Sequence, residues 1–343
     1  DISVKSDIPP KYPVRQGVSK IKIKWSETLR YAGPYPKKSK QFFRMETLQR
    51  ALEKKLEEKD YFLYRSFKEG LDGKTPDSLA VDLVYENKSR LIFSLLAGSR
   101  QGKRTSLYLM MAKNHEEFSA ALEQEYAAFQ APGMSGHNGF IPVLRQGLIY
   151  LPDRHQRRDI NRELFAWLFR LPGEWAPLYV ASSTQWGPRG SEVRRFTVQE
   201  TEKIKCELIR HLAAAYDPDQ FEGVTPRLLS SDDLWVKKNK DRSFSLAIAS
   251  CRRLDKKLRP GQFVASLLFG SFGEGQHRLP LAPARPEHFR DALMKALPAD
   301  HAAALLAAFF RQRSLHEKKL SPELKQLLPG ADYLDALEAC LHP

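Results

Sequence analysis

The stretch SLYLMMAK, residues 106–113, is an apolar, β-prone segment that ends in a single lysine. Two similar segments precede it, Leu79–Tyr85 and Leu91–Ala97, and the residues between the three are polar and suited to turns. The segment that follows, His115–Gln130, has apolar residues at the spacing of an amphipathic helix. We therefore predict a meander of three strands with a helix directly after the third.

Further elements are predicted on both sides of this meander. Upstream, Lys20–Lys24 alternates lysine with isoleucine as an edge strand would, and Met45–Asp60 has leucines four residues apart, which is typical of a surface helix. Downstream, Phe140–Leu144 and Gly147–Leu151 are predicted as two short strands. The β-rich region therefore has the order strand, strand, strand, helix, strand, strand.

The remainder of the chain has mainly helical patterns. Asn161–Leu171 is apolar at helical spacing and is followed by a Pro-Gly pair, so it is predicted as a helix. The other predicted helices are Glu200–Tyr216, Glu287–Leu297, Asp300–Leu315 and Tyr333–Leu341. The exception is Leu234–Ala249, where two apolar runs flank a polar turn and predict a hairpin.

These patterns predict an α+β protein with three regions. A basic N-terminal extension with one helix covers residues 1–77, and a small β-rich lobe covers 78–155. A larger, mainly helical lobe covers residues 156–343. The length of 343 residues is more than a single compact core usually absorbs, which agrees with two structural units.

Composition narrows the class of protein. Hydrophobic residues make up 42% of the sequence, more than a disordered chain would have. No apolar run approaches the roughly 20 residues of a transmembrane helix, so we expect no transmembrane segment. The three cysteines lie far apart, which favours a reducing, cytoplasmic location and predicts no structural metal.

The net charge of +14 favours an anionic macromolecular partner, such as a nucleic acid, a phosphorylated glycan or an acidic protein. Candidate contacts combine aromatic rings, on which bases stack, with cations that neutralise phosphate. They are Trp25, Tyr31, Lys37, Lys38, Lys40, Arg100, Lys103, Arg104, Arg154, Arg157 and Arg158. The alternative for the N-terminal group is an arm whose aromatic side chains pack on the main domain.

The order of elements over roughly residues 78–320 resembles the protein-kinase-like superfamily, in particular its small-molecule and lipopolysaccharide-core kinases. The resemblance implies a bilobal fold, with a small five-stranded β lobe that holds one helix and a larger helical lobe. In that family a lysine at the end of the third strand pairs with a glutamate on the next helix and orients the nucleotide phosphates. Lys113 matches this lysine, and Glu125 in the sequence EQEYAAF matches the glutamate, with Glu123 as the alternative.

The catalytic segment of the family is matched by Pro226–Val236, with departures. The family's base aspartate falls at Leu228, and the aspartate that should follow the hairpin falls at Ala249. Asp233 stands at the position of the metal-binding asparagine and offers an oxygen ligand. The first turn, Glu86–Arg90, has no glycine that would let the backbone approach phosphates.

Three functions follow as hypotheses. The first is a kinase-fold protein that lacks conventional kinase activity and acts as a binding or regulatory module for an anionic partner. The second is an atypical ATP-dependent transferase or kinase acting on an anionic sugar or protein, with ATP and Mg²⁺ bound by Lys113, Glu125 and Asp233 and no catalytic residue assigned. The third is a nucleic-acid-binding protein that uses its basic surface.

Overall fold

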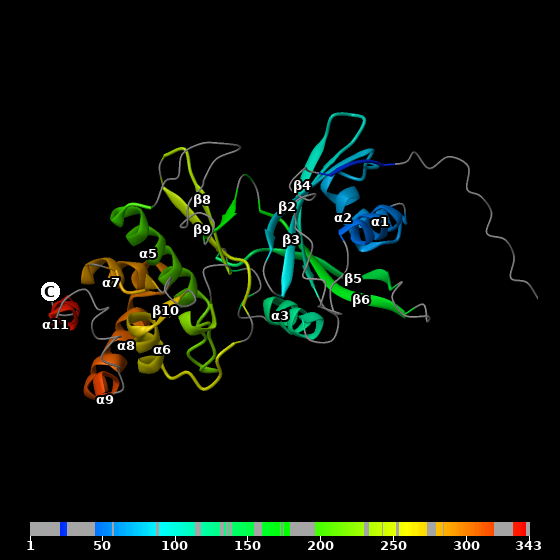
Figure 1. Ribbon diagram of the computed structural model, residues 1–343. Coiled ribbons are helices and arrows are strands. Elements are labelled where there is room, and N and C mark those ends of the chain that lie inside the picture. Colours follow the sequence, from blue (N-terminus) through cyan, green and yellow to red (C-terminus); the bar gives the residue numbers. More distant parts are fainter. Residues whose placement is uncertain are drawn as a thin grey trace, which may run out of the picture.

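The computed structural model describes residues 21–25, 45–56, 58–86, 89–113, 118–130, 134, 137, 139–153, 160–171, 173, 175–178, 196–229, 233–241, 243–251, 254–272, 279–283, 285–318 and 332–340. Figure 1 shows two parts: a sheet with three helices, α1–α3, and a helical part with a smaller sheet of its own.

The larger sheet has six strands in the order β1-β2-β3-β4-β6-β5. These strands are β1 (Lys22–Trp25), β2 (Ser78–Glu86), β3 (Arg90–Gly98), β4 (Arg104–Ala112), β5 (Val143–Asp153) and β6 (Ile160–Phe169). The predicted meander and the predicted edge strand are confirmed, since β2, β3 and β4 pair antiparallel and β1 pairs parallel to β2. The lobe was predicted with five strands, and it has six because β1 joins the edge of the sheet.

Both faces of the sheet are buried in its central strands. Along β4, Leu107, Leu109 and Met111 face one apolar cluster, and the residues between them face another. Helices α1 (Met45–Leu56) and α2 (Phe62–Gly70) cover the first face, whereas α3 (Ala120–Gln130) and the helical part cover the second (Figure 1). Because successive side chains of a strand point to opposite faces, β4 contributes side chains to both apolar clusters.

The helix predicted at Asn161–Leu171 is wrong, because this segment forms β6. Phe165, Trp167 and Phe169 enter one core while the alternate residues enter the other, so the strand reads as a continuous apolar run. A run of this kind cannot be distinguished from a buried helix by its periodicity. The segments 140–144 and 147–151 were predicted as two strands that pair with each other, but residues 143–153 form one continuous strand, β5. Its partner is β6, which lies beyond the boundary predicted at residue 155.

The helical part contains the predicted hairpin, β8 (Leu234–Lys238) and β9 (Phe244–Ile248), with β7 (Ala176–Pro177) paired to β8. Its helical elements are α5 (Val198–Ala214), the 3₁₀ turn η3 (Pro226–Leu228), α6 (Pro260–Phe269), α7 (Pro286–Ala296), α8 (Ala299–Phe310), α9 (Arg313–Lys318) and α11 (Tyr333–Ala339). A short pair, β10 (Ser271–Phe272) and β11 (Leu279–Pro280), completes it. The helix predicted over 300–315 is divided after Phe310 into α8 and α9.

The two parts share one apolar core, which joins the second face of the sheet to α5, β8, β9 and α6. The architecture is the α+β, bilobal, kinase-like one expected from the order of elements, with α3 between the third and fourth of the antiparallel strands β2–β6. None of the helices in the described part of the chain has both the length and the apolar character that a bilayer crossing requires.

Candidate functional site

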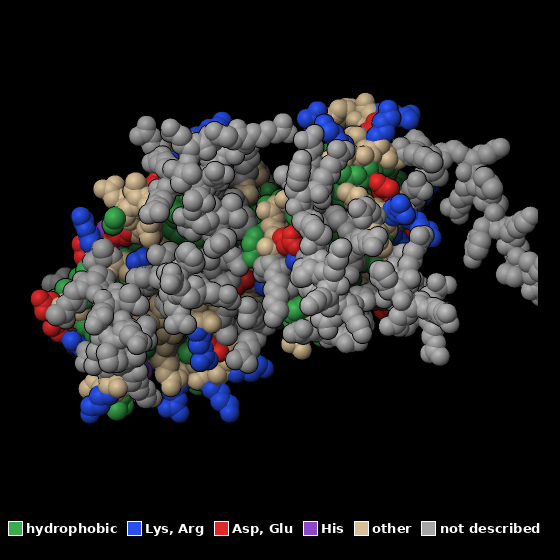
Figure 2. Space-filling view, viewed as in Figure 1, with side chains coloured by type: hydrophobic (Ala, Val, Ile, Leu, Met, Phe, Trp, Pro, Cys, Tyr) green, Lys and Arg blue, Asp and Glu red, His purple; other side chains and the backbone are tan. Residues whose placement is uncertain are grey.

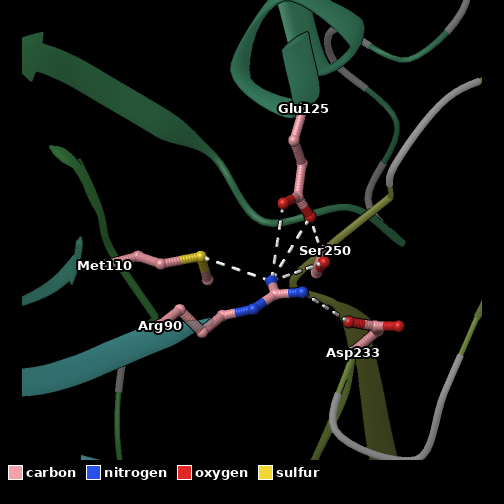
Figure 3. A network of polar contacts seen from close by, with 5 residues as sticks. All are labelled: Arg90, Met110, Glu125, Asp233 and Ser250. Carbon is pink, nitrogen blue, oxygen red and sulfur yellow. Dashed lines mark hydrogen bonds and ion pairs between the residues drawn. The ribbon is translucent and has the colours of Figure 1, made fainter. Parts of the chain in front are cut away.

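A polar cluster lies where the sheet meets the helical part, and Arg90 is at its centre (Figure 3). Arg90 opens β3, and its Nη1 donates a hydrogen bond of 2.7 Å to Ser250 Oγ, just after β9. The same guanidinium faces both Glu125 oxygens at 3.5 Å and Asp233 Oδ1 at 3.4 Å. Ser250 in turn donates to Glu125, so one cation ties α3 and β3 to the start of β8.

This cluster is closed to solvent. Arg90 is 8% exposed, Glu125 3% and Asp233 1%. Each charged group at such depth has lost several kcal/mol of hydration free energy. Ion pairs and hydrogen bonds must offset this loss. The sulfur of Met110, on β4, lies 3.6 Å from the Arg90 guanidinium and fills the remaining side.

The electrostatics of Glu125 follow from this setting. Burial is the largest influence and raises the pKa of its carboxyl above the ordinary value. Arg90 opposes that rise, Asp233 adds to it, and the hydrogen bonds from Ser250 and from the Cys251 backbone lower the pKa. Two carboxylates that share one guanidinium therefore compete for its positive charge.

Lys113, at the end of β4, forms an ion pair with Glu86 at the end of β2, with 2.5 Å between Nζ and Oε1. Its backbone N–H donates to the carbonyl oxygen of Ser89, so the lysine is fixed beside the first turn of the meander. Lys113 is 4% exposed. Of the three residues predicted to bind nucleotide and metal, the structure brings Glu125 and Asp233 together through Arg90 and pairs Lys113 with Glu86.

The segment that resembles a catalytic loop has near its start an arginine that forms a structural ion pair. Pro226–Leu228 forms the 3₁₀ turn η3, and Arg227 makes two hydrogen bonds to the buried carboxylate of Asp255, at 3.1 and 2.7 Å. Thr225 also donates to Asp255. Asp255, which lies near this segment in the sequence, is thereby committed to holding the loop in place.

The position after the hairpin offers no carboxylate. Ala249 is fully buried, and its backbone N–H donates to the carbonyl oxygen of Asp233 at 2.7 Å. This bond fixes Asp233 at the entry of β8, directly beside the end of β9. A divalent cation bound to Asp233 would therefore lie against the Arg90 guanidinium, and like charges repel strongly in a buried site. The residues present do not fit a metal ion at this position.

Aromatic rings fill the interface next to the polar cluster. Trp235 on β8 packs edge-on against Tyr108 and Phe169 of the sheet, with ring centroids 5.0 and 5.7 Å apart. Tyr108 and Phe169 stack on each other at 5.1 Å. All three are at most 5% exposed, so the two parts meet in close packing at this point.

The predicted anion-binding residues are spread over several places. Arg100, Lys103 and Arg104 lie exposed in and beside the turn between β3 and β4. The indole of Trp25 donates a 2.9 Å hydrogen bond to Glu53 of α1, which agrees with the alternative of an arm packed on the main domain. Tyr31, Lys37, Lys38, Lys40, Arg154, Arg157 and Arg158 lie outside the described residues.

Sequence reasoning missed Arg90, Ser250 and Glu86 as members of the site. Arg90 was assigned to a polar turn, yet it is the first residue of β3 and its side chain is buried. The available signal was an arginine that directly precedes the apolar run LIFSLLA. A positively charged side chain in this position either points to solvent or needs an acidic partner. The acidic partners of Arg90 are 35 and 143 residues away in the sequence.

Among the comparisons with known proteins, only the one with solved structures finds similar chains. No protein-family model matches the sequence, and no curated protein does. Among solved structures, the chain is similar to a PAN3 pseudokinase mutant from Neurospora crassa, with 12% identity, a TM-score of 0.32, and coverage of 85% of this chain and 71% of that one. It is also similar to the PAN3 pseudokinase from Drosophila melanogaster, with 9% identity, a TM-score of 0.29, and coverage of 73% of this chain and 62% of that one.

Proposed function

We propose that this chain is a kinase-fold protein without conventional kinase activity, which acts as a binding or regulatory module for an anionic partner. The observation that carries the proposal is the Arg90 guanidinium between Glu125 and Asp233. Phosphoryl transfer depends on metal-borne charge neutralisation and on groups that position the reactants. Here an internal cation already pairs with Asp233, the residue that was predicted to hold the metal ion.

Two substitutions support the same conclusion. The positions that the family uses for its base and for its second metal ligand carry Leu228 and Ala249, whose side chains have no oxygen. The ring cluster around Trp235 adds to this, because a nucleotide base would have to displace packed aromatic side chains to enter between the two parts. Because these rings already pack the two parts against each other, no nucleotide is needed to hold the parts together.

The partner is proposed from charge. The chain carries 55 Lys and Arg residues against 41 Asp and Glu residues, and a surplus of this size attracts polyanions over long range. Because the interface between the two parts is closely packed around Trp235, we infer that binding takes place on the outer surface. A cytoplasmic location stays a prediction.

A thermal-shift titration tests the absence of a nucleotide site. The full chain and its Lys113→Ala variant would be heated with ATP, in the presence and absence of Mg²⁺ or Mn²⁺. We expect no metal-dependent rise in the melting temperature of either protein. A ligand at 100 times its Kd adds about 2.7 kcal/mol of stability, which is roughly 4 °C for a chain of this size.

The competing hypothesis predicts the opposite outcome of the same titration. If the chain is an atypical ATP-dependent transferase that uses Lys113, Glu125 and Asp233, the melting temperature of the wild type rises with ATP and metal. The Lys113→Ala variant then loses that rise. This pair of results would contradict the proposal and would justify assays of phosphoryl transfer.

A further inference from the structure

The turn between β3 and β4 and the residues beside it carry the cations of a surface that we call the basic tip. Its members are Lys22, Lys74, Arg100, Lys103 and Arg104, all of them exposed or half-buried. The turn lies at the top of the sheet in Figure 1. In Figure 2, Lys and Arg side chains gather on both sides of that region.

The basic tip is built on a rigid support. Lys22, Ser78, Gly98 and Arg104 are register partners on four neighbouring strands, β1 to β4. Strands lie about 4.8 Å apart, so this row extends over about 14 Å. The turn itself is closed by two backbone hydrogen bonds of 2.9 Å between Ser99 and Lys103 and between Gly102 and Ser99. The cations are therefore presented at fixed places at the end of the sheet.

The charge of the basic tip is mostly uncompensated. Asp72 pairs with Lys103, and this hydrogen bond, helped by the nearby charge of Lys74, lowers the pKa of the Asp72 carboxyl. Within the described part of the chain, Arg100 and Arg104 have no ion-pair partner. Gly102 in this turn has a φ of +80°, and among the described residues no atom lies within 4 Å of the place where a Cβ would be.

The polar character of this surface indicates the kind of partner. Of the large apolar side chains that are exposed in the described residues, Leu96 is the one on β1–β4. Protein partners usually meet an apolar centre surrounded by polar groups. Surfaces that contact the phosphates and sugars of nucleic acids are instead polar and strongly positive. The basic tip has the second character.

We propose that the basic tip binds the sugar-phosphate backbone of a nucleic acid, independently of base sequence. The inference rests on the binding role proposed above and gives that role a place and a partner class. Guanidinium groups form forked hydrogen bonds with phosphate, and the row of about 14 Å has a cation at each end, Lys22 and Arg104, so it can span more than one phosphate. Asp72 then limits the affinity, because it neutralises one of the cations.

The test measures the anisotropy of a fluorescein-labelled 20-nucleotide oligouridylate with the full chain, between 50 and 300 mM salt. The tip variant is Arg100→Ala/Arg104→Ala. Its control, Arg311→Ala/Lys318→Ala, removes the same charge from exposed positions on the helical part. We expect the tip variant to bind roughly ten-fold more weakly at low salt and its salt slope to fall by about 1.4, or 0.7 for each lost phosphate contact.

A third variant, Asp72→Asn, separates binding from folding. Asp72 has a φ of +53°, a conformation that asparagine also adopts, so the substitution leaves the backbone unstrained. It frees Lys103 and removes a negative charge, and we expect binding to become tighter by about two-fold or more. Damage to the fold cannot produce a gain in affinity.

Three results would overturn the inference: no binding at 50 mM salt, equal losses in the tip and control variants, or a polyglutamate peptide that binds as tightly as the oligonucleotide. The last result would identify an acidic protein as the partner. All of these outcomes leave the Arg90 cluster untouched, since that cluster is tested by metal and nucleotide. Failure of this inference is thus distinguishable from failure of the proposed function.

Discussion

Replacement of Arg90 by methionine should lower the stability of the protein substantially. Methionine keeps an unbranched side chain of similar length but removes the charge, so Glu125 and Asp233 lose their shared guanidinium. These carboxylates are 3% and 1% exposed. Removal of one partner from a buried ion pair costs about 3–5 kcal/mol, because the remaining charge stays buried without compensation.

Urea unfolding, followed by tryptophan fluorescence, measures this loss. The matched control is Arg65→Met, because Arg65 pairs with Asp60 at the surface, where the two side chains are 54% and 95% exposed. Exposed pairs of this kind contribute about 0–1 kcal/mol. We expect the two variants to differ by several kcal/mol in the free energy of unfolding.

A double variant shows whether the loss comes from the cluster. Glu125→Gln in the Arg90→Met background removes one of the two buried carboxylates that have lost the guanidinium. It should recover part of the stability, with a coupling energy of about 1–3 kcal/mol between the two substitutions. If Arg90→Met loses less than about 1 kcal/mol and matches the surface control, the guanidinium does not compensate buried charge. The central role given to Arg90 would then be refuted.

Two predictions concern pH. Burial raises the pKa of the Glu125 carboxyl above the ordinary value of 4.5, so the folded state binds this proton more tightly than the unfolded state does. The stability of the wild type relative to Glu125→Gln should therefore fall as the pH rises above 4.5. Equal pH profiles of the two proteins would contradict the raised pKa. Burial lowers the pKa of His211 to about 4, and its Nε2 lies 3.0 Å from the carbonyl oxygen of Leu246. The wild type should therefore lose about 3 kcal/mol between pH 6.5 and pH 4 through this group, and urea titrations should show a smaller loss in His211→Gln.

Local patterns were sufficient to predict the elements that bury only one face or follow turns. The alternation of Lys20–Lys24 and the strands on both sides of residues 86–90 were predicted correctly, and so were α5 and the hairpin. Residues 160–169 were not, because a strand buried on both faces loses the alternation that marks a strand. The sequence carries no local signal that separates this strand from a buried helix.

The site was predictable only in part, for a related reason. Lys113, Glu125 and Asp233 could be selected by their places in the order of elements. The identity of their partners could not, since Arg90 and Ser250 are brought to them by contacts between residues up to 160 positions apart. Whether a buried acid is available to a metal or is already paired depends on such contacts, and no spacing rule reveals them.

The central claim is that the Arg90 guanidinium, which lies between Glu125 and Asp233, keeps a metal ion away from these two carboxylates, and electron paramagnetic resonance of Mn²⁺ tests it directly. The signal of free Mn²⁺ is recorded with wild type, with Arg90→Met and with Arg90→Met/Asp233→Asn. We predict that the wild type leaves the signal unchanged, that Arg90→Met reduces it by binding the ion at the two carboxylates that have lost the guanidinium, and that the double variant restores it. Stoichiometric binding of Mn²⁺ by the wild type, lost in Asp233→Asn, would contradict the claim.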